Sequence, residues 1–141
     1  MKRIILLSFF GFLFMLSSCN KETSPYAIIK TDLGDIKIKL FKSTPRHTEQ
    51  FITLAKRGFY DGLIFHRILK GFMIQGGNTQ IRTEEVSVEI AANPAEIDHE
   101  IGEYHYRGSL CAARTPNPEK RSGSQFYIVD GSPVTDQMLD S

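Results

Sequence analysis

The first part of the chain alternates apolar and polar positions in the manner of a two-stranded hairpin. Residues 26–31 are rich in β-branched and aromatic side chains, and residues 32–35 read Asp-Leu-Gly-Asp, a turn signal. From Ile36 to Leu40, apolar side chains then alternate with lysines. This alternation predicts a strand with one face on a core and the other in water.

A single helical pattern follows the hairpin. Ser43 and Thr44 offer capping hydroxyls, and Pro45 suits the first helical position. Apolar residues then recur at helical spacing until Gly58, where we expect the helix to stop.

The rest of the chain consists of short apolar runs separated by Gly and Pro signals. Gly76-Gly77-Asn78 and residues 115–118 (Thr-Pro-Asn-Pro) mark the clearest breaks. The apolar runs are Leu63–Leu69, Phe72–Gln75, Val86–Ile90, Leu110–Ala113 and Phe126–Val129. Many short strands with one good helix predict a mainly β domain, either a barrel or a sandwich.

Composition agrees with one globular domain and narrows the possible partners. The chain has 141 residues, of which 41% are hydrophobic and 23% are charged, with a formal net charge of +1. Because no field of one sign results, nothing indicates a nucleic-acid partner. The four histidines show no ligand spacing with Cys or acidic residues, so we expect no metal site.

The N-terminus resembles an export signal. Met1-Lys2-Arg3 precedes an apolar run from Ile4 to Leu16, and small residues lead to Cys19. A helix of 13 residues would cover about 20 Å, which is too short for a hydrocarbon core of ~30 Å. We therefore expect a cleaved signal rather than a transmembrane anchor.

Leu16-Ser17-Ser18-Cys19 is similar to a bacterial lipobox, which implies that Cys19 is lipidated and that residues 1–18 are removed. The alternative is a simple cleaved signal with an incidental cysteine. Residues 19–25 are then a polar tether, and residues 26–141 are the domain. Cys111 lies in an apolar run, so we expect a small buried residue rather than a nucleophile. The expected location is the cell envelope, lipid-anchored, on the periplasmic or outer-membrane face.

Two segments contain polar side chains that the folding of a β domain does not require. One is residues 65–77, Phe-His-Arg-Ile-Leu-Lys-Gly-Phe-Met-Ile-Gln-Gly-Gly, and the other runs from Gly108 to Val129. Strand alternation places Met73 and Gln75 on one face, and likewise Gln125 and Tyr127. Amides on an otherwise apolar face suit an extended peptide, whose backbone donors and acceptors must be met when water leaves.

These segments resemble the cyclophilin family of peptidyl-prolyl isomerases. Residues 65–77 match the family's Phe-His-Arg…Gly-Phe-Met-Ile-Gln-Gly-Gly signature, and residues 108–129 match Gly-x-Leu…Ala…Gly-Ser-Gln-Phe-Phe-Ile, with Tyr127 in the second aromatic place. The resemblance implies a cyclophilin-like antiparallel eight-stranded barrel with capping helices. It also implies an active groove on the outer surface and no cofactor.

The resemblance assigns a role to each matching position. Arg67 would be catalytic, and Arg114 stands where many members have Asn. The implied substrate-binding residues are Phe72, Met73, Gln75, Ala113, Gln125 and Tyr127. Arg67 taken alone would more often be a surface charge, and Phe72 and Met73 taken alone would more often be core; only the surrounding motif favours the site.

Arginine suits the implied reaction. Rotation about a peptide bond must overcome a barrier of ~18–20 kcal/mol that arises from amide resonance. In the twisted state the prolyl nitrogen regains a lone pair, to which a fixed guanidinium can donate more strongly than in the planar state. The partners would be proline-containing polypeptides, with the protein a membrane-anchored monomer.

The family pattern continues beyond the strand at residues 126–129, whereas this chain ends at Ser141. We therefore expect an incomplete barrel that lacks its C-terminal closing segment, with impaired or lost catalysis. Two other hypotheses stay open: a non-catalytic binding module or chaperone for proline peptides, and an inactive truncated fragment.

Overall fold

The computed structural model describes residues 24–83, 85, 87, 90, 92, 94–114 and 121–132. The predicted signal, the lipidation site Cys19 and most of the tether lie outside the described residues. So do most of the predicted strand Val86–Ile90 and the break at residues 115–118. Within the part that the structure describes, no helix combines the length and apolar character that crossing a bilayer requires.

The predicted hairpin is confirmed. Strand β1 (Tyr26–Thr31) pairs antiparallel with strand β2 (Gly34–Lys39). Ile38 and Leu40 are each only 6% exposed, while the lysines between the apolar positions face water. The hairpin therefore has one face on the core and one in solvent, as its alternation predicts.

Helix α1 (Pro45–Lys56) begins with Pro45 in its first turn, and Gly58 follows its end with a φ of +71°. The predicted hydroxyl cap is wrong for Thr44, whose side chain makes no capping hydrogen bond. Thr44 has a ψ of 66°, and its hydroxyl lies 3.5 Å from the Phe41 carbonyl oxygen instead. The cap comes from Glu100, which accepts hydrogen bonds from the backbone N–H groups of Arg46 and His47 at 3.1 and 2.9 Å.

Four further strands form one antiparallel sheet in the order β3-β4-β6-β5. They are β3 (Arg67–Leu69), β4 (Met73–Gly76), β5 (Leu110–Arg114) and β6 (Ser122–Val129). Each falls within or beside a predicted apolar run. The sheet brings the two motif segments together, since β3 and β4 come from the first and β5 and β6 from the second.

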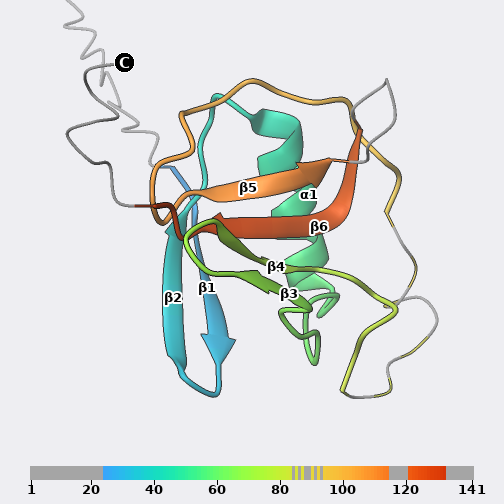
Figure 1. Cartoon of the computed structure of the whole chain (residues 1–141). Helices are drawn as coiled ribbons and strands as arrows, with labels where there is room; N and C mark the ends of the chain where they lie inside the picture. Colours follow the sequence, from blue (N-terminus) through green and yellow to red (C-terminus); the bar gives the residue numbers. More distant parts are fainter. Residues whose placement is uncertain are drawn as a thin grey trace, which may run out of the picture.

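The core lies between this sheet and helix α1 (Figure 1). Phe126 of β6 packs edge-on against Phe51 of α1, Tyr60 and Phe65, with ring centroids 5.7, 5.6 and 6.1 Å away. Edge-to-face aromatic contacts of this kind add to the gain from burial. They fix the side of β6 that faces inward, so its other residues must face outward.

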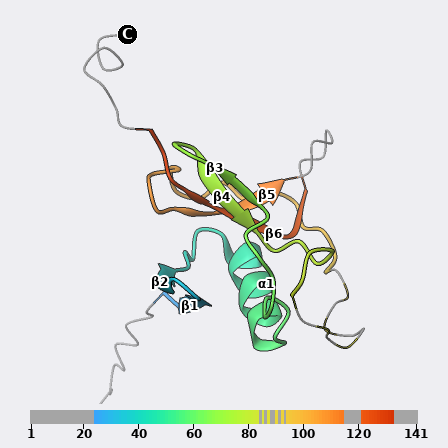
Figure 2. The same cartoon turned by 60° about the horizontal axis from the view of Figure 1, so that its bottom comes forward.

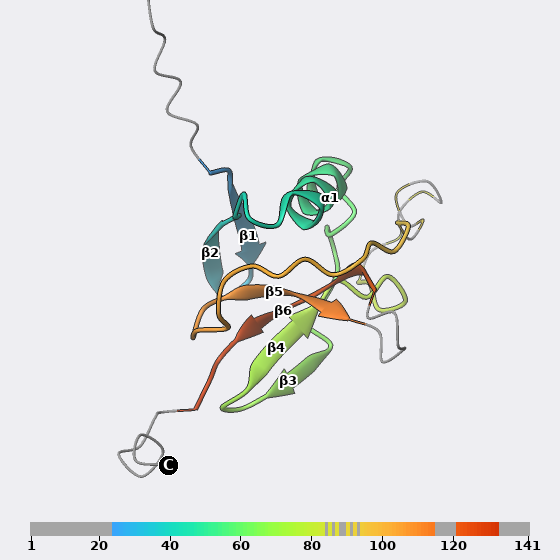
Figure 3. The ribbon, with the colours of Figure 1, turned by 90° about the horizontal axis from the view of Figure 1, so that it is seen from above.

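The hairpin and α1 lie together on one side of the four-stranded sheet (Figure 2), and the two sheets are separate (Figure 3). The mainly β, antiparallel fold class is confirmed. The eight strands and closed barrel that the resemblance implies are not complete in the described residues, which hold six strands in two sheets and one helix. The described residues therefore do not close a barrel.

Candidate site on the outer face of the sheet

A row of four side chains crosses the sheet, one from each strand. Arg67 pairs with Gln75, Gln75 with Tyr127, and Tyr127 with Cys111. Directly paired residues of an antiparallel sheet point to the same face. Because Phe126 faces the core, this row lies on the opposite, outer face.

The amides of the row are linked to the guanidinium. Gln75 Nε2 donates to Gln125 Oε1 at 2.9 Å, and Arg67 Nη1 lies 3.5 Å from Gln75 Oε1. Arg67 is exposed, whereas both glutamines are half-buried. The structure thus brings together three residues that the sequence assigned to one site, with the charged group at the solvent side.

Phe72 and Met73 stand beside this row but differ in exposure. Phe72 is 56% exposed, in the turn between β3 and β4, whereas Met73 is only 3% exposed. The end of β6 holds that turn: Asp130 Oδ2 accepts from the Gly71 N–H at 2.8 Å, and the Ser132 hydroxyl donates to the Gly71 carbonyl at 2.9 Å. The Phe72 ring is therefore open to solvent, whereas Met73, which points to the same face as Gln75 by strand alternation, is covered by its neighbours.

Tyr127 has two neighbours that the sequence did not assign to the site. Its hydroxyl lies 3.1 Å from His105 Nδ1, and the two rings pack edge-on at 5.9 Å. Burial, reinforced by the nearby Cys111 thiol, raises the pKa of Tyr127 to about 12. The phenol is therefore neutral at physiological pH. No sequence signal marks His105, because it lies in an irregular segment 22 residues before Tyr127.

Cys111 is a buried free thiol on β5, as expected. Burial raises its pKa, which disfavours the nucleophilic thiolate. Cys111 thus fills space beside Tyr127 rather than offering a reactive group.

Ala113 and Arg114 lie at the far end of edge strand β5. A β-bulge between Ala112 and Arg114 shifts the register there, so Ala113 has no direct partner on β6. Arg114 is exposed and Ala113 is half-buried. Of the predicted site residues, Ala113 is the one whose place relative to the row is least fixed by strand pairing.

A cavity of about 770 Å³ adjoins the row, between α1, the segment 99–105 and the pair β5–β6. Cys111, Gln125 and Tyr127 line it, whereas Arg67, Phe72, Met73, Gln75 and Ala113 do not. Its inner wall is formed by the core rings of Phe51, Tyr60 and Phe126. The cavity therefore lies between the Tyr127 end of the row and the aromatic core.

A serine, a histidine and a carboxylate meet at the margin of this cavity. His47 Nδ1 lies 2.7 Å from Glu100 Oε2, and His47 Nε2 lies 2.7 Å from the Ser122 hydroxyl. The order resembles a hydrolase triad. Ser122, however, is 0% exposed, so no substrate can reach its oxygen. The trio is a structural link between α1, the segment around Glu100 and β6.

Among the described residues, no group of three or more His, Cys, Asp or Glu side chains could hold a metal ion. The geometry on the outer face therefore offers a guanidinium, two amides and aromatic surfaces. Such groups bind and polarise an extended peptide without metal chemistry of their own.

Comparison with known proteins gives one consistent family. The profile of the family described as cyclophilin type peptidyl-prolyl cis-trans isomerase/CLD matches residues 26–140. A peptidyl-prolyl cis-trans isomerase of Helicobacter pylori strain J99 is 39% identical over 109 residues, which cover 73% of this chain and 61% of that protein. One from Acinetobacter baylyi is 36% identical over 115 residues, 81% of this chain and 59% of that protein.

Among solved structures, a cyclophilin type isomerase of Cryptosporidium parvum, crystallised in the presence of the dipeptide Ala-Pro, aligns with a TM-score of 0.62 and 30% identity. The alignment covers 82% of this chain and 83% of that one. The chain spans about three-fifths of the length of the two bacterial relatives, 61% and 59%.

Proposed function

Because the chain belongs to the cyclophilin type peptidyl-prolyl cis-trans isomerase family, we propose that it catalyses cis-trans isomerisation of X-Pro bonds in polypeptides. The observation that carries the proposal is the row on the outer face, in which Arg67, Gln75 and Tyr127 are consecutive cross-strand partners. This row places a cation, an amide and an aromatic ring side by side on one surface.

The proposed mechanism is selective stabilisation of the twisted amide. Arg67 donates to the lone pair that the prolyl nitrogen regains as resonance is lost, and the planar ground state offers no such acceptor. Arginine stays charged at any working pH. The contact with Gln75 Oε1 at 3.5 Å helps to hold the guanidinium in place, which reduces reorganisation during the reaction.

The remaining groups would bind the substrate. Phe72 and Tyr127 offer ring surfaces for the proline, with Met73 beneath them, and Gln75 and Gln125 offer amides for the backbone on either side. The Cryptosporidium relative was crystallised in the presence of Ala-Pro, which agrees with a proline-containing ligand for this fold. No step needs a nucleophile or a proton transfer.

A protease-coupled assay with a proline tetrapeptide tests the proposal. The purified chain should accelerate cis-to-trans conversion over the thermal rate, and Arg67→Ala should lower kcat/KM by about 10²-fold or more. Lys56→Ala, which removes an exposed charge from the last turn of α1, is the matched control and should keep full activity.

Peptide binding measured by fluorescence distinguishes the two alternatives, a non-catalytic binding module or chaperone and an inactive fragment. Binding without acceleration would show that the protein is a binding module or chaperone that uses the same amides, and not an isomerase. If the chain neither binds the peptide nor accelerates isomerisation, it is an inactive fragment.

We further propose that the protein acts on envelope proteins as they fold, anchored by lipid on Cys19. The lipobox-like Leu16-Ser17-Ser18-Cys19 supports this location. Incorporation of labelled fatty acid into the wild-type chain, and its loss in Cys19→Ser, tests it. Equal labelling of both would count against the anchor.

A further inference from the structure

The outward face of the β1–β2 hairpin carries apolar and basic side chains together. We call this set the outer hairpin face; its members are Tyr26, Ile28, Lys30, Asp35, Lys37 and Lys39, all of them exposed. The register pairs Tyr26 with Lys39 and Ile28 with Lys37 across the two strands. Each apolar side chain on this face is thus flanked by an ammonium group.

The apolar members are unusually open to solvent. Tyr26 is 60% exposed and Ile28 is 56% exposed, and Leu33 at the hairpin tip is fully exposed at 101%. Phe41, just after β2, is 42% exposed. Such side chains on one hairpin form a local apolar surface, which often marks an interaction site.

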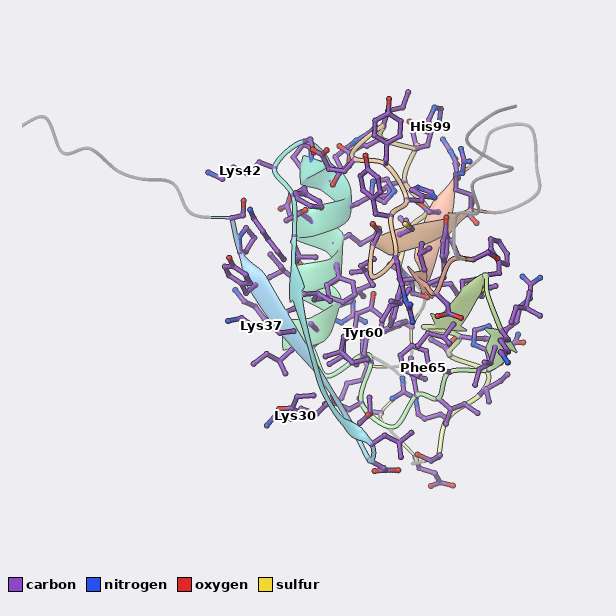
Figure 4. All side chains as sticks on the ribbon, turned by 60° about the vertical axis from the view of Figure 1, so that its left-hand side comes forward. Lys30, Lys37, Lys42, Tyr60, Phe65 and His99 are labelled. Atoms are coloured by element: carbon purple, nitrogen blue, oxygen red, sulfur yellow. The ribbon has the colours of Figure 1, made fainter. Side chains whose placement is uncertain are left out.

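The charge of the same surface is one-sided. It holds three lysines against one carboxylate, and Asp32 in the turn and Lys42 just after β2 add one charge of each sign, although the whole chain has a formal net charge of only +1. Figure 4 shows Lys30 and Lys37 projecting from the hairpin, and Lys42 from the segment that follows it, away from α1 and the four-stranded sheet. The basic groups are therefore concentrated where little else of the domain approaches.

Lysines and rings are also in contact. The Lys37 ammonium lies 5.0 Å from the centroid of the Tyr26 ring, and the Lys39 ammonium lies 5.9 Å from that of Phe41. At exposed sites such contacts are weak. The contacts nevertheless place the ammonium groups and the aromatic rings next to one another on the surface. A partner with a flat surface could therefore contact the lysines and the rings at the same time.

We propose that the outer hairpin face docks on an anionic phospholipid surface. Lysines within a Debye length of such a surface are attracted to phosphate groups. Tyrosine rings favour the membrane–water interface, where one end is wet and the other apolar. A basic and aromatic hairpin satisfies both requirements without inserting a helix.

The position of the hairpin in the chain supports this partner over others. Tyr26 is seven residues after Cys19, so a lipid on Cys19 would hold the hairpin within roughly 25 Å of the bilayer. This part of the argument rests on the proposed lipid anchor. The charge and exposure of the hairpin do not depend on it, nor on the isomerase activity. Docking would fix the orientation of the domain, with the Arg67 row on a different sheet from the membrane-facing hairpin.

Vesicle co-sedimentation tests the proposal on the chain from Asn20 onward, which lacks both the apolar run Ile4–Leu16 and Cys19. It should bind vesicles of phosphatidylglycerol and phosphatidylethanolamine and not vesicles of phosphatidylcholine, and the binding should weaken as salt is raised. Lys37→Glu/Lys39→Glu should lower the partition coefficient at least about tenfold. The proline-peptide assay should be unchanged in that variant, because both lysines belong to the hairpin and not to the sheet that carries the row.

Lys56→Glu/Lys70→Glu is the matched control, since it changes the net charge equally at two exposed positions off the hairpin. It should retain binding within about twofold. An equal loss in both double variants would reduce the effect to net charge and overturn the docking face. Failure to bind anionic vesicles would also overturn it and would point to a protein partner. Loss of isomerase activity with intact vesicle binding would contradict only the proposed function.

Discussion

Gln75 donates a hydrogen bond from Nε2 to Oε1 of Gln125 at 2.9 Å, and this bond fixes the orientation of the Gln75 amide. With its nitrogen turned toward β6, Gln75 directs its oxygen toward Arg67 Nη1, 3.5 Å away. The three side chains therefore form one connected polar unit. The Arg67 guanidinium at the end of this unit is oriented by the Gln75 amide, which is in turn fixed by its hydrogen bond to Gln125.

This linkage predicts that Gln75 acts partly by positioning Arg67. Gln75→Ala should lower kcat by about tenfold or more, because a misplaced guanidinium loses much of its effect on the twisted amide. The proline-peptide assay measures this, with kcat separated from KM. Gln80→Ala, an exposed glutamine outside the row, is the control. A rise in KM alone would show that Gln75 serves only substrate binding.

A second prediction concerns the close approach of two chain segments at Gly77. This residue has a φ of +85°, and a Cβ built on it would lie 2.5 Å from the Ser124 carbonyl oxygen and 2.9 Å from the Gln125 Cα. Both obstacles are backbone atoms of β6, which cannot move aside without shifting Gln125. Gly77→Ala should therefore destabilise the fold by about 3 kcal/mol or more, as measured by urea unfolding.

The matched control for Gly77 is Gly108, which has nearly the same backbone conformation, with a φ of +86°. A Cβ on Gly108 meets nothing within 4 Å, so Gly108→Ala should cost only the strain of the left-handed backbone, about 1–2 kcal/mol. Similar losses in both variants would show that this strain, and not the contact with β6, is responsible.

The hairpin, helix α1 and the four strands of the larger sheet could be predicted because each obeys a local rule. Alternation placed Ile38 inside, and Pro45 and Gly58 marked the ends of the helix. What could not be predicted is long-range: Glu100 caps α1 from more than 50 residues away, where local reasoning expected a hydroxyl. A carboxylate from another segment leaves no spacing signal near the helix that it caps.

The candidate site also has a part that the sequence predicts and a part that depends on long-range contacts. The resemblance assigned Arg67, Gln75 and Tyr127 to one groove, and alternation paired only Met73 with Gln75 and Gln125 with Tyr127. The strand register places Arg67, Gln75 and Tyr127 on one face. The burial of Cys111 was predicted, but its place beside Tyr127 was not, and His105 belongs to no pattern that points to a groove. They come together through the pairing of β5 with β6 and the path of the preceding segment.

A third prediction is acid sensitivity at Glu100. Burial by itself would raise the pKa of Glu100, but hydrogen bonds from His47 and from the Arg46 backbone outweigh it, so the pKa lies below its ordinary value. The folded state thus favours the carboxylate. Its contribution to stability is complete above the ordinary pKa of 4.5 and is lost as the pH falls through the lower folded value.

Glu100→Gln should therefore destabilise the protein by about 1 kcal/mol at neutral pH, and its difference from wild type should shrink as the solution becomes acidic. Urea midpoints at several pH values measure this. Glu49→Gln, at an exposed position of α1, should keep a midpoint close to that of wild type at every pH. A Glu100→Gln penalty that does not vary with pH would mean that the charge contributes nothing.

The last prediction uses the phenol of Tyr127. Burial raises its pKa from 10.0 to about 12, because the phenolate would lose its hydration on a partly covered face. In the unfolded chain the phenol ionises at its ordinary pKa, so the unfolded state loses its proton first as the pH rises. Stability should consequently decline above pH 10, and Tyr127→Phe should make that decline less steep.

Phenolate absorbance measured against pH in the folded state provides a direct test, because Tyr127→Phe should remove one late-titrating group. Tyr26→Phe, which alters a largely exposed ring, is the comparison and should leave the late step in place. If the Tyr127→Phe change instead removes a step near the ordinary pKa, the ring is open to water, and the packing of His105 against Tyr127 does not persist in solution. The hydroxyl then could not help to hold the ring in the outer row, and Tyr127 would bind proline through a freely turning side chain.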